Sequence, residues 1–197
     1  MYKPLNRTAA CLEPQLYLDK TIDLVERCRA GERKAQYDLY RQYSKAMYNV
    51  CFRIVGHEAE AEDVLQDAFL DAFTHLGSFR GQSTFGAWLK QITVNRAIGH
   101  LRSRRLNLVS TDGQRIGEDD GIDVADSEPV DEAGIAWEVE RVRRAVQTLP
   151  EGYRVVLSLY LFEGYDHEEI SNVLNISEVT SRSQYMRAKK KVLELLR

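Results

Sequence analysis

A polar, acidic segment in the middle of the chain constrains the possible folds more than any other feature. Residues 106–131 carry no apolar stripe, and four acids lie between Glu118 and Asp123. A segment this polar cannot pack a core, and about 26 residues are too few for a further domain. The sequence therefore predicts a flexible acidic linker here, between small domains over residues 19–105 and 132–197, with a flexible tail over residues 1–18.

Both predicted domains have the apolar spacing of helices. The chain has only 12 Gly and 4 Pro, and runs of alternating β-branched residues are hard to find. Leu39, Tyr43 and Met47 recur at helical intervals, and Gly56 follows as a stop. We therefore expect an all-α fold, with helices over residues 19–30, 32–55, 58–75, 84–105, 132–148, 151–162, 166–174 and from 177 to the end.

The charges are gathered into blocks. The net charge is only −3, yet residues 72–111 hold no acid, and residues 179–197 hold six bases against one acid. Between these blocks, residues 112–140 hold eleven acids and one base. Attraction to a polyanion depends on the local field, so the two basic blocks indicate nucleic-acid binding although the whole chain is acidic.

The C-terminal end has the pattern of a helix-turn-helix. Asp166 and Glu169 form a predicted capping box, Asn175 and Ile176 a tight turn, and Ser177 the cap of the last helix. The polar side of the last helix combines groups that suit base edges with cations that suit phosphates: Thr180, Arg182, Ser183, Gln184, Arg187 and Lys190. The alternative interpretation is an ordinary solvated helix face.

A second candidate nucleic-acid site lies around the start of the 84–105 helix, which Ser83 or Thr84 is expected to cap. The loop before it is polar, and we expect it to contact nucleic acid through Arg80, Gly81, Gln82 and Ser83. Cations of the acid-free helix are expected to hold phosphates: Lys90, Arg96, Arg102 and Arg104. Trp88 lies on the same helical stripe as Phe85, so core packing explains it at least as well as stacking on an unpaired base.

The 58–75 helix has an unusual exposed face. Helical geometry places Leu65, Ala68, Phe69, Ala72 and Leu76 on one side, toward the core. The other side carries Asp63, Gln66, Asp67 and Leu70. A single exposed leucine means little by itself, but a leucine among acids suggests a docking surface for a basic partner helix.

Several of these segments together resemble the bacterial sigma factors. The second sigma domain is similar to Ala61–Phe69, Phe79–Leu89 and Val94–Ala97, and the fourth to Leu149–Leu157 and Ile176–Ala188. The resemblance covers roughly residues 19–197 in the family's order. Because the predicted linker leaves no room for a third domain, the likeness is to the extracytoplasmic-function (ECF) group of the sigma-70 family, the minimal two-domain factors.

The resemblance implies a transcription initiation factor that binds core RNA polymerase and promoter DNA. By position, Asp63, Gln66, Asp67 and Leu70 would contact the clamp helices of the polymerase. Arg80–Ser83, with Asn95 and Arg96, would hold the melted −10 element, while the last helix would read the −35 duplex and its domain would meet the polymerase flap. Many family members are held inactive by an anti-sigma protein, which is a candidate partner here.

The sequence departs from the family pattern at positions that read the promoter. Val179 stands where a small residue is usual, Ser181 where an aliphatic is usual, and Gln184 where arginine is frequent. Ser181 also points toward the apolar stripe of the last helix, where we expect it to bond to the backbone one turn earlier. The −35 sequence therefore cannot be transferred from relatives.

Two other classes of function were weighed. A conventional helix-turn-helix regulator would bind duplex DNA without polymerase, but would need neither the acid-free tract nor the docking helix. An enzyme is disfavoured because the four histidines are scattered and form no HExxH pair, and no GxxxxGK[ST] loop is present. We predict no catalytic residue, cofactor, metal or small-molecule substrate.

The chain is expected to be soluble and cytoplasmic. Cys11, Cys28 and Cys51 are odd in number and lack metal-ligand spacing, which fits a reducing compartment. No stretch approaches the ~20 apolar residues of a membrane span, and the N-terminus lacks the apolar core of a signal peptide.

Overall fold

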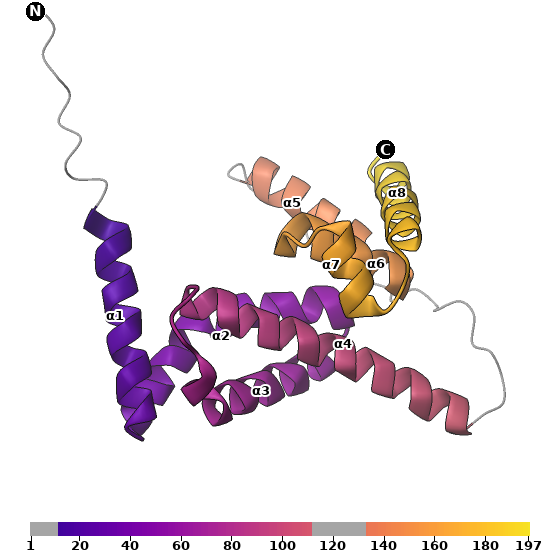
Figure 1. The fold of residues 1–197 in the computed structure, drawn as a ribbon. Helices are drawn as coiled ribbons and strands as arrows, with labels where there is room; N and C mark the ends of the chain where they lie inside the picture. The colour runs from indigo at the N-terminus through magenta and orange to yellow at the C-terminus, as the bar shows by residue number, and fades with distance from the viewer. Residues whose placement is uncertain (1–11, 112–132) are drawn as a thin grey trace, which may run out of the picture.

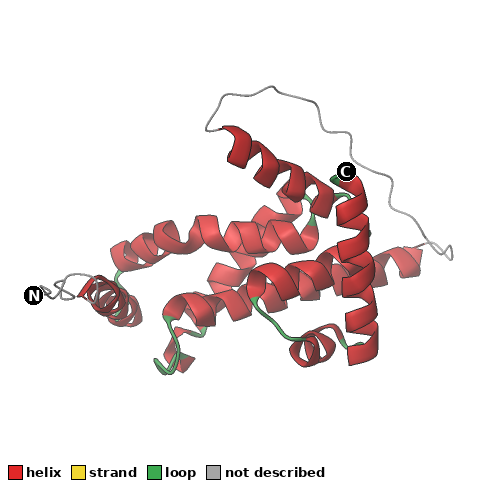
Figure 2. Ribbon diagram, turned by 90° about the horizontal axis from the view of Figure 1, so that it is seen from above, coloured by secondary structure: helices red, strands yellow, loops and turns green. Residues whose placement is uncertain are grey.

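The computed structural model describes residues 12–111 and 133–197, and within these ranges the chain is helical without any strand (Figure 1, Figure 2). The all-α prediction is confirmed for this part of the chain. The elements are α1 (Leu12–Arg29), α2 (Arg33–Val55), α3 (Glu58–Thr74), η1 (Leu76–Ser78), α4 (Phe85–Thr111), α5 (Ala133–Gln147), α6 (Glu151–Ser158), η2 (Leu159–Glu163), α7 (His167–Leu174) and α8 (Glu178–Leu195). None of these helices is both long and apolar enough to cross a membrane.

The N-terminal half (residues 12–111) is built on three helices that pack together, α2, α3 and α4, with α1 crossing one end of them (Figure 1). Leu39, Ile54 and Leu89 are fully buried between the helices. The face of α3 predicted to point inward does so, since all five of its apolar residues are buried. Burial of the three large side chains, Leu65, Phe69 and Leu76, contributes about 1.5–3 kcal/mol each, which makes this stripe a main reason why α3 stays in place.

The C-terminal half (residues 133–197) contains the predicted helix-turn-helix. The Asp166 carboxylate accepts a hydrogen bond from the Glu169 amide (2.7 Å), and Glu169 accepts one from the Asp166 amide (2.9 Å), as a capping box requires. Asn175 takes a left-handed conformation (φ 56°) in the turn, and Ser177 accepts from the Thr180 amide to cap α8. The predicted caps and turn are therefore confirmed.

Two helices extend beyond the predicted limits. Helix α1 begins at Leu12 and not near Asp19, so the part of the predicted tail over residues 12–18 is helical. Pro14 falls in the first turn of α1, where its missing N–H breaks no helical hydrogen bond. Helix α4 continues past Arg105 to Thr111, through residues that include neither Gly nor Pro. The rest of the predicted tail and linker lies outside the described residues.

The π-helical turn after α6 was not predicted from the sequence. The predicted helix over 151–162 ends as an α-helix at Ser158 and continues as η2, a π-helical turn that Gly164 closes at φ 80°. Such turns hold an extra residue and are common at functional positions. Here the turn directs Glu163 into the protein, where its side chain is 2% exposed.

The two halves of the chain pack against each other. Helix α6 lies on α2, and α7 lies near α4 (Figure 1). Val155, Val156, Leu159 and Ile170 belong to the same buried cluster as the core of α2, α3 and α4. The linker pattern predicted two domains but did not predict this shared core.

Candidate nucleic-acid interface

The loop before α4 presents its polar residues to solvent. Arg80, Gly81, Gln82 and Ser83 are all exposed, and Gly81 has a positive φ of 70° that suits glycine. Thr84 is the residue that caps α4, because its hydroxyl accepts a hydrogen bond from the Ala87 amide at 3.2 Å. The loop is therefore anchored at one end by a helix cap and open along its length.

A cavity of about 280 Å³ lies between this loop and α1. Its lining combines the apolar side chains of Ile22, Val25 and Phe85 with the polar loop residues Gln82 and Ser83. Apolar walls beside a polar rim suit a flat ring with polar edges, so the cavity can receive an unstacked base.

Arg29, near the end of α1, holds the start of the loop. Its guanidinium donates to the carbonyl oxygen of Leu76 at 3.2 and 3.3 Å and also to that of Phe79. Glu26 pairs with the same side chain at 2.6 Å. Sequence reasoning missed this residue, because its partners lie 47 and 50 positions away.

Trp88 belongs mainly to the core. Its ring lies 5.4 Å from that of Phe79 and 5.6 Å from that of Phe85, and the indole is only partly buried. The interpretation of Trp88 as a core residue is therefore supported. Its remaining surface borders a second, open hollow of about 390 Å³ that Asn95 and Arg96 also line.

Arg96 is held by a carboxylate in this hollow. Asp71 of α3 accepts from its guanidinium through both oxygens, at 2.5 Å for the outer nitrogen Nη2. The hydrogen bond from Arg96 lowers the pKa of Asp71, so the pair is fully charged near neutral pH. Arg96 is still about half exposed and Asn95 is exposed, so both side chains are accessible from solvent.

Lys90 does not face solvent in the way that the prediction requires. Its ammonium donates to the main-chain oxygen of Glu163 at 2.9 Å, in the C-terminal half. Arg102 and Arg104 are engaged from the same side, by the Val173 carbonyl (2.5 Å) and the Glu151 carboxylate. Of the four cations predicted to hold phosphates on α4, Lys90, Arg102 and Arg104 are thus engaged by the C-terminal half, whereas Arg96 is engaged by Asp71 of the N-terminal half.

The docking face of α3 is free of the rest of the protein. Asp63, Gln66, Asp67 and Leu70 are all exposed, as the helical pattern predicts. Leu70 leaves 65% of its surface exposed, which is unusual for a leucine on a helix whose other face is buried. The structure thus brings these residues together on one surface.

The predicted reading face of α8 is exposed, with one partial exception. Thr180, Arg182, Ser183, Arg187 and Lys190 are exposed, although Arg182 pairs with Glu178 at 2.6 Å. Gln184 is half-buried, with its amide close to Gly152 of α6. The exposed polar groups on this face of α8 therefore come mainly from its first turns and from Arg187.

The predicted hydrogen-bond partner of the Ser181 hydroxyl is wrong. Ser181 is fully buried, and its hydroxyl lies 2.9 Å from Nδ1 of His167 on α7 and not on the backbone one turn earlier. The imidazole is stacked against Tyr160, with ring centres 4.7 Å apart. The polar pair replaces an aliphatic contact between the two helices, which satisfies a buried hydroxyl.

No group of three or more His, Cys, Asp or Glu side chains is arranged to hold a metal ion within the described ranges. Cys28 and Cys51 are buried free thiols.

Two family models and several known proteins match this chain. The family models Sigma-70 region 2 and Sigma-70, region 4 match residues 39–106 and 139–192. The RNA polymerase sigma-H factor of Pseudomonas aeruginosa is 35% identical over 175 residues, which cover 86% of this chain and 90% of the relative. The ECF RNA polymerase sigma-E factor of Escherichia coli is 30% identical over 182 residues, with the same two coverages, 86% and 90%.

One solved structure supports the fold. It contains the sigma factor RpoE of Bartonella quintana in complex with the anti-sigma factor NepR. The superposition has a TM-score of 0.54 at 23% identity and covers 81% of this chain and 95% of that chain.

Proposed function

The chain belongs to the ECF group of the sigma-70 family, the factors that direct RNA polymerase to promoters, and from this membership we propose how its surfaces divide that work. The docking face of α3 binds core polymerase, the loop before α4 holds the melted −10 strand, and α8 reads the −35 duplex. The chain acts in the cytoplasm and forms or breaks no covalent bond itself, because RNA synthesis belongs to the polymerase.

The docking face fits a helical partner that carries basic residues. Leu70 supplies an exposed apolar contact, and Asp63 and Asp67 supply carboxylates beside it. Charge complementarity across such a face speeds association and fixes orientation, while Leu70, once covered by the partner, supplies affinity. The clamp helices of the polymerase are the partner that family membership suggests.

The −10 strand meets the loop and the adjoining hollow. An extruded base enters the cavity between α1 and the loop, with Gln82 and Ser83 at its polar edge. Asn95 and Arg96 contact the neighbouring nucleotides from the other hollow, beside Trp88. Stacking and charge together give each base about 1–3 kcal/mol in such sites.

The −35 element is read by α8 in the major groove, mainly through Arg182, Ser183 and Arg187. The observation that carries the whole proposal is the exposure of two nucleic-acid faces on separate elements, the loop of the N-terminal half and α8 of the C-terminal half. A conventional regulator would need only the second, and family membership does not favour that alternative.

An anti-sigma protein is a further proposed partner. The Bartonella factor similar to this chain was solved in complex with one. The exposed docking face is the surface on which such an inhibitor competes directly with polymerase, because one helix face cannot hold two partners.

In vitro transcription tests the function. Purified bacterial core polymerase is incubated with genomic DNA, with and without this protein, and start sites are mapped. New discrete start sites that share −35 and −10 motifs are the expected result. Specific duplex binding by the protein alone, without new starts, would contradict the proposal and favour a conventional regulator.

A further inference from the structure

A carboxylate lines the hollow beside Trp88, where a surface for nucleic acid is expected to be basic. Asp71 of α3 is the one acid among the described side chains that line this hollow, and Asn95 and Arg96 lie there too. It is also the last acid before the acid-free block over residues 72–111. A free carboxylate would repel the phosphates of a strand, so Asp71 suits such a surface only with a cationic partner.

That partner is Arg96 of α4, and the contact between them has the geometry of a fork. The guanidinium donates from Nη2 to Oδ1 of Asp71 at 2.5 Å, and from Nε to Oδ2. Two parallel hydrogen bonds fix both the direction of the side chain and the plane of the guanidinium, which a single bond leaves free. Arg96 is therefore held in one orientation before any ligand arrives, although a long arginine side chain otherwise samples many.

The fork leaves the outer edge of the guanidinium open. It uses Nε and one N–H of Nη2, so the second N–H of Nη2 and those of Nη1 point away from Asp71. These outer N–H groups form a second fork, which fits two oxygens of a phosphate. The Arg96 side chain is 47% exposed and that of Asp71 only 27%, so the carboxylate lies on the protein side of the pair. A phosphate can therefore reach Arg96 without displacing Asp71.

Asp71 is itself held near the end of α3. Its main-chain oxygen accepts a hydrogen bond from the His75 amide at 2.9 Å, and Nδ1 of His75 lies 2.9 Å from the same oxygen. The hydrogen bond from Asp71 and the charge of Asp67, one turn earlier on α3, both raise the pKa of Arg96. The pair therefore stays charged and in place near neutral pH.

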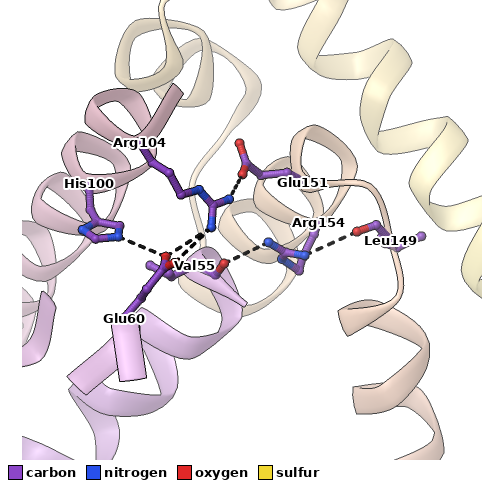
Figure 3. Close-up of polar contacts among 7 residues, drawn as sticks. All are labelled: Val55, Glu60, His100, Arg104, Leu149, Glu151 and Arg154. Carbon is purple, nitrogen blue, oxygen red and sulfur yellow. Dashed lines mark hydrogen bonds and ion pairs between the residues drawn. The ribbon is translucent and has the colours of Figure 1, made fainter. Parts of the chain in front are cut away.

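A structural role is the alternative explanation for this pair, but arginines that join other parts of the fold have buried partners or are buried themselves. Arg154 of α6 is 5% exposed and donates to the Val55 carbonyl at 3.1 Å, at the end of α2, as Figure 3 shows. It fits beneath Gly56, where a Cβ would lie 2.6 Å from the guanidinium carbon. Arg53 of α2 donates at 2.5 and 3.1 Å to Glu163, whose side chain is 2% exposed.

The pair of Asp71 and Arg96 differs from both of these contacts. It lies at the surface, where an isolated ion pair contributes little to stability because water and salt screen it. The packing of α3 on α4 depends instead on buried apolar side chains such as Leu65, Phe69 and Leu89. The pair is therefore placed to serve a ligand more than to hold the two helices together.

We propose that Asp71 is a positioning residue for the −10 strand, which acts by aiming the outer fork of Arg96 at a phosphate of that strand. This role rests on the proposed function, which assigns Arg96 to the melted strand. Trp88, Ile92 and Arg96 follow one another at intervals of four on α4, so they share one face of the helix and line the same hollow. A nucleotide on this face sets its base against Trp88 and Ile92 and its phosphate at Arg96.

The test uses the full-length protein in holoenzyme with core polymerase. The probe is a fluorescein-labelled promoter duplex identified by start-site mapping with wild type, with its −10 element mispaired so that the non-template strand is already single. Its affinity is measured over a range of salt concentrations for Asp71→Asn, Arg96→Ala, the double variant and Asp71→Glu. Glu140→Gln is the matched control, because Glu140 forms an exposed ion pair with Arg144 on α5. A pull-down with core polymerase and thermal melting check docking and folding.

Asp71→Asn is expected to weaken binding about 3- to 10-fold, although it removes a negative charge beside the DNA. Asparagine has the same shape but only one acceptor, so the fork is reduced to a single bond. The slope of log K against log salt should become shallower by up to about 0.7, the value for one phosphate of a single strand. Asp71→Glu should recover part of the loss because it keeps both oxygens, and Glu140→Gln should match wild type.

The double variant isolates the path of the effect. In the Arg96→Ala background, Asp71→Asn should change the affinity by less than about 2-fold, because the side chain that it positions is gone. An equal loss in that background would show that Asp71 does not act through Arg96 and would overturn the proposal.

Two further results would overturn it. Tighter binding by Asp71→Asn, or binding equal to that of wild type, would show that the carboxylate repels the strand or does not affect it. A matching loss of core polymerase binding would assign Asp71 to the docking face. Start-site mapping with wild type tests the proposed function separately. Without new start sites both fail, whereas new start sites with an unaffected Asp71→Asn variant would remove only the role of Asp71.

Discussion

At the scale of single residues, Arg29 shows which properties of a side chain could be predicted from the sequence and which could not. Exposure and burial follow helical spacing, which is why Leu70 and the buried face of α3 were predicted correctly. The partners of a long side chain do not follow from spacing, because Arg29 reaches a carbonyl 50 positions away. The same limit applies to Lys90. The sequence analysis assigned it to phosphate, and spacing along the helix did not predict its hydrogen bond to the Glu163 carbonyl.

Arg29 is expected to position the loop that meets the −10 strand. Substituting Arg29→Ala removes the donors to Leu76 and Phe79 and frees the loop to sample other conformations. Open-complex formation should therefore fall about 5- to 30-fold, which corresponds to about 1–2 kcal/mol. Permanganate reactivity of unpaired thymines at the promoter measures this. Polymerase binding should be unchanged, and Arg29→Lys should restore only part of the loss. Equal loss of polymerase binding would mean that the domain is damaged as a whole.

Arg187 is expected to read a base in the −35 element. Truncation in Arg187→Ala should weaken specific binding by the holoenzyme by about 1–3 kcal/mol and relax preference at one base pair. Competition between promoter and scrambled duplexes measures the difference, with Lys189→Ala, an exposed neighbour, as the control. Equal weakening on both duplexes would assign Arg187 to a phosphate.

The burial of Cys28 and Cys51 predicts how the free energy of unfolding changes at alkaline pH. Burial raises the pKa of Cys51 to about 12 and that of Cys28 to about 11, from an ordinary value of 9.0. The folded protein keeps both thiols neutral while the unfolded chain ionises them, so the free energy of unfolding should fall as pH rises above 9.

Thiol labelling at pH 8 checks the same burial. Cys28 and Cys51 should react much more slowly in the native protein than in urea, with mass spectrometry identifying each labelled residue. Rapid labelling of either in the native state would show that its helix opens locally.

At the scale of helices, the sequence predicted which helices form and in what order more accurately than it predicted where each helix begins and ends. Gly56, the capping box of α7 and the Ser177 cap are local signals, and the corresponding helix ends were found where expected. The start of α1, the end of α4 and the π-helical turn η2 have no such signal. In η2, the buried Glu163 pairs with Arg53 of α2, 110 positions away, and spacing along one helix does not report such a partner.

The docking face of α3 carries a prediction at this scale. Leu70→Asp or Asp67→Lys should weaken binding to core polymerase by about 2 kcal/mol or more, because the face loses its apolar centre or a complementary charge. Both side chains are exposed, so thermal stability should change little. Val139→Asp, at an exposed apolar position on α5, is the control in a pull-down with core polymerase. Normal holoenzyme assembly by the α3 variants would contradict the assignment.

At the scale of the whole molecule, two predicted domains behave as one packed unit. Residues of α6 and α7 complete the core of the N-terminal half, and buried Glu163 and Arg154 join the halves. The composition of the acidic segment predicts a division of the chain into two domains. It did not predict the contact, because the interface is assembled from single residues of α2, α4, α6 and η2.

This shared core predicts cooperative unfolding. Wild type should unfold in one thermal transition, since neither half can open without exposing the core of the other. Glu163→Gln should separate the melting into two transitions or broaden it, because the halves then unfold more independently. Scanning calorimetry measures both, with Glu140→Gln as the control. Two transitions in wild type would mean that the shared core adds little to stability.

The fit of Arg154 beneath Gly56 has a consequence for anyone who wishes to exchange promoter preferences between such proteins. The acidic segment looks like a natural place to join the front of one factor to the back of another. A chimaera made there would unite a foreign helix end with this arginine. A side chain at the position of Gly56 would displace the guanidinium from its hydrogen bond to the carbonyl at the end of α2. The two halves stay matched only if Gly56 is exchanged together with Arg154, and Arg53 together with Glu163. In this chain, these pairs of residues must therefore be transferred as units, and a whole domain cannot be exchanged without them.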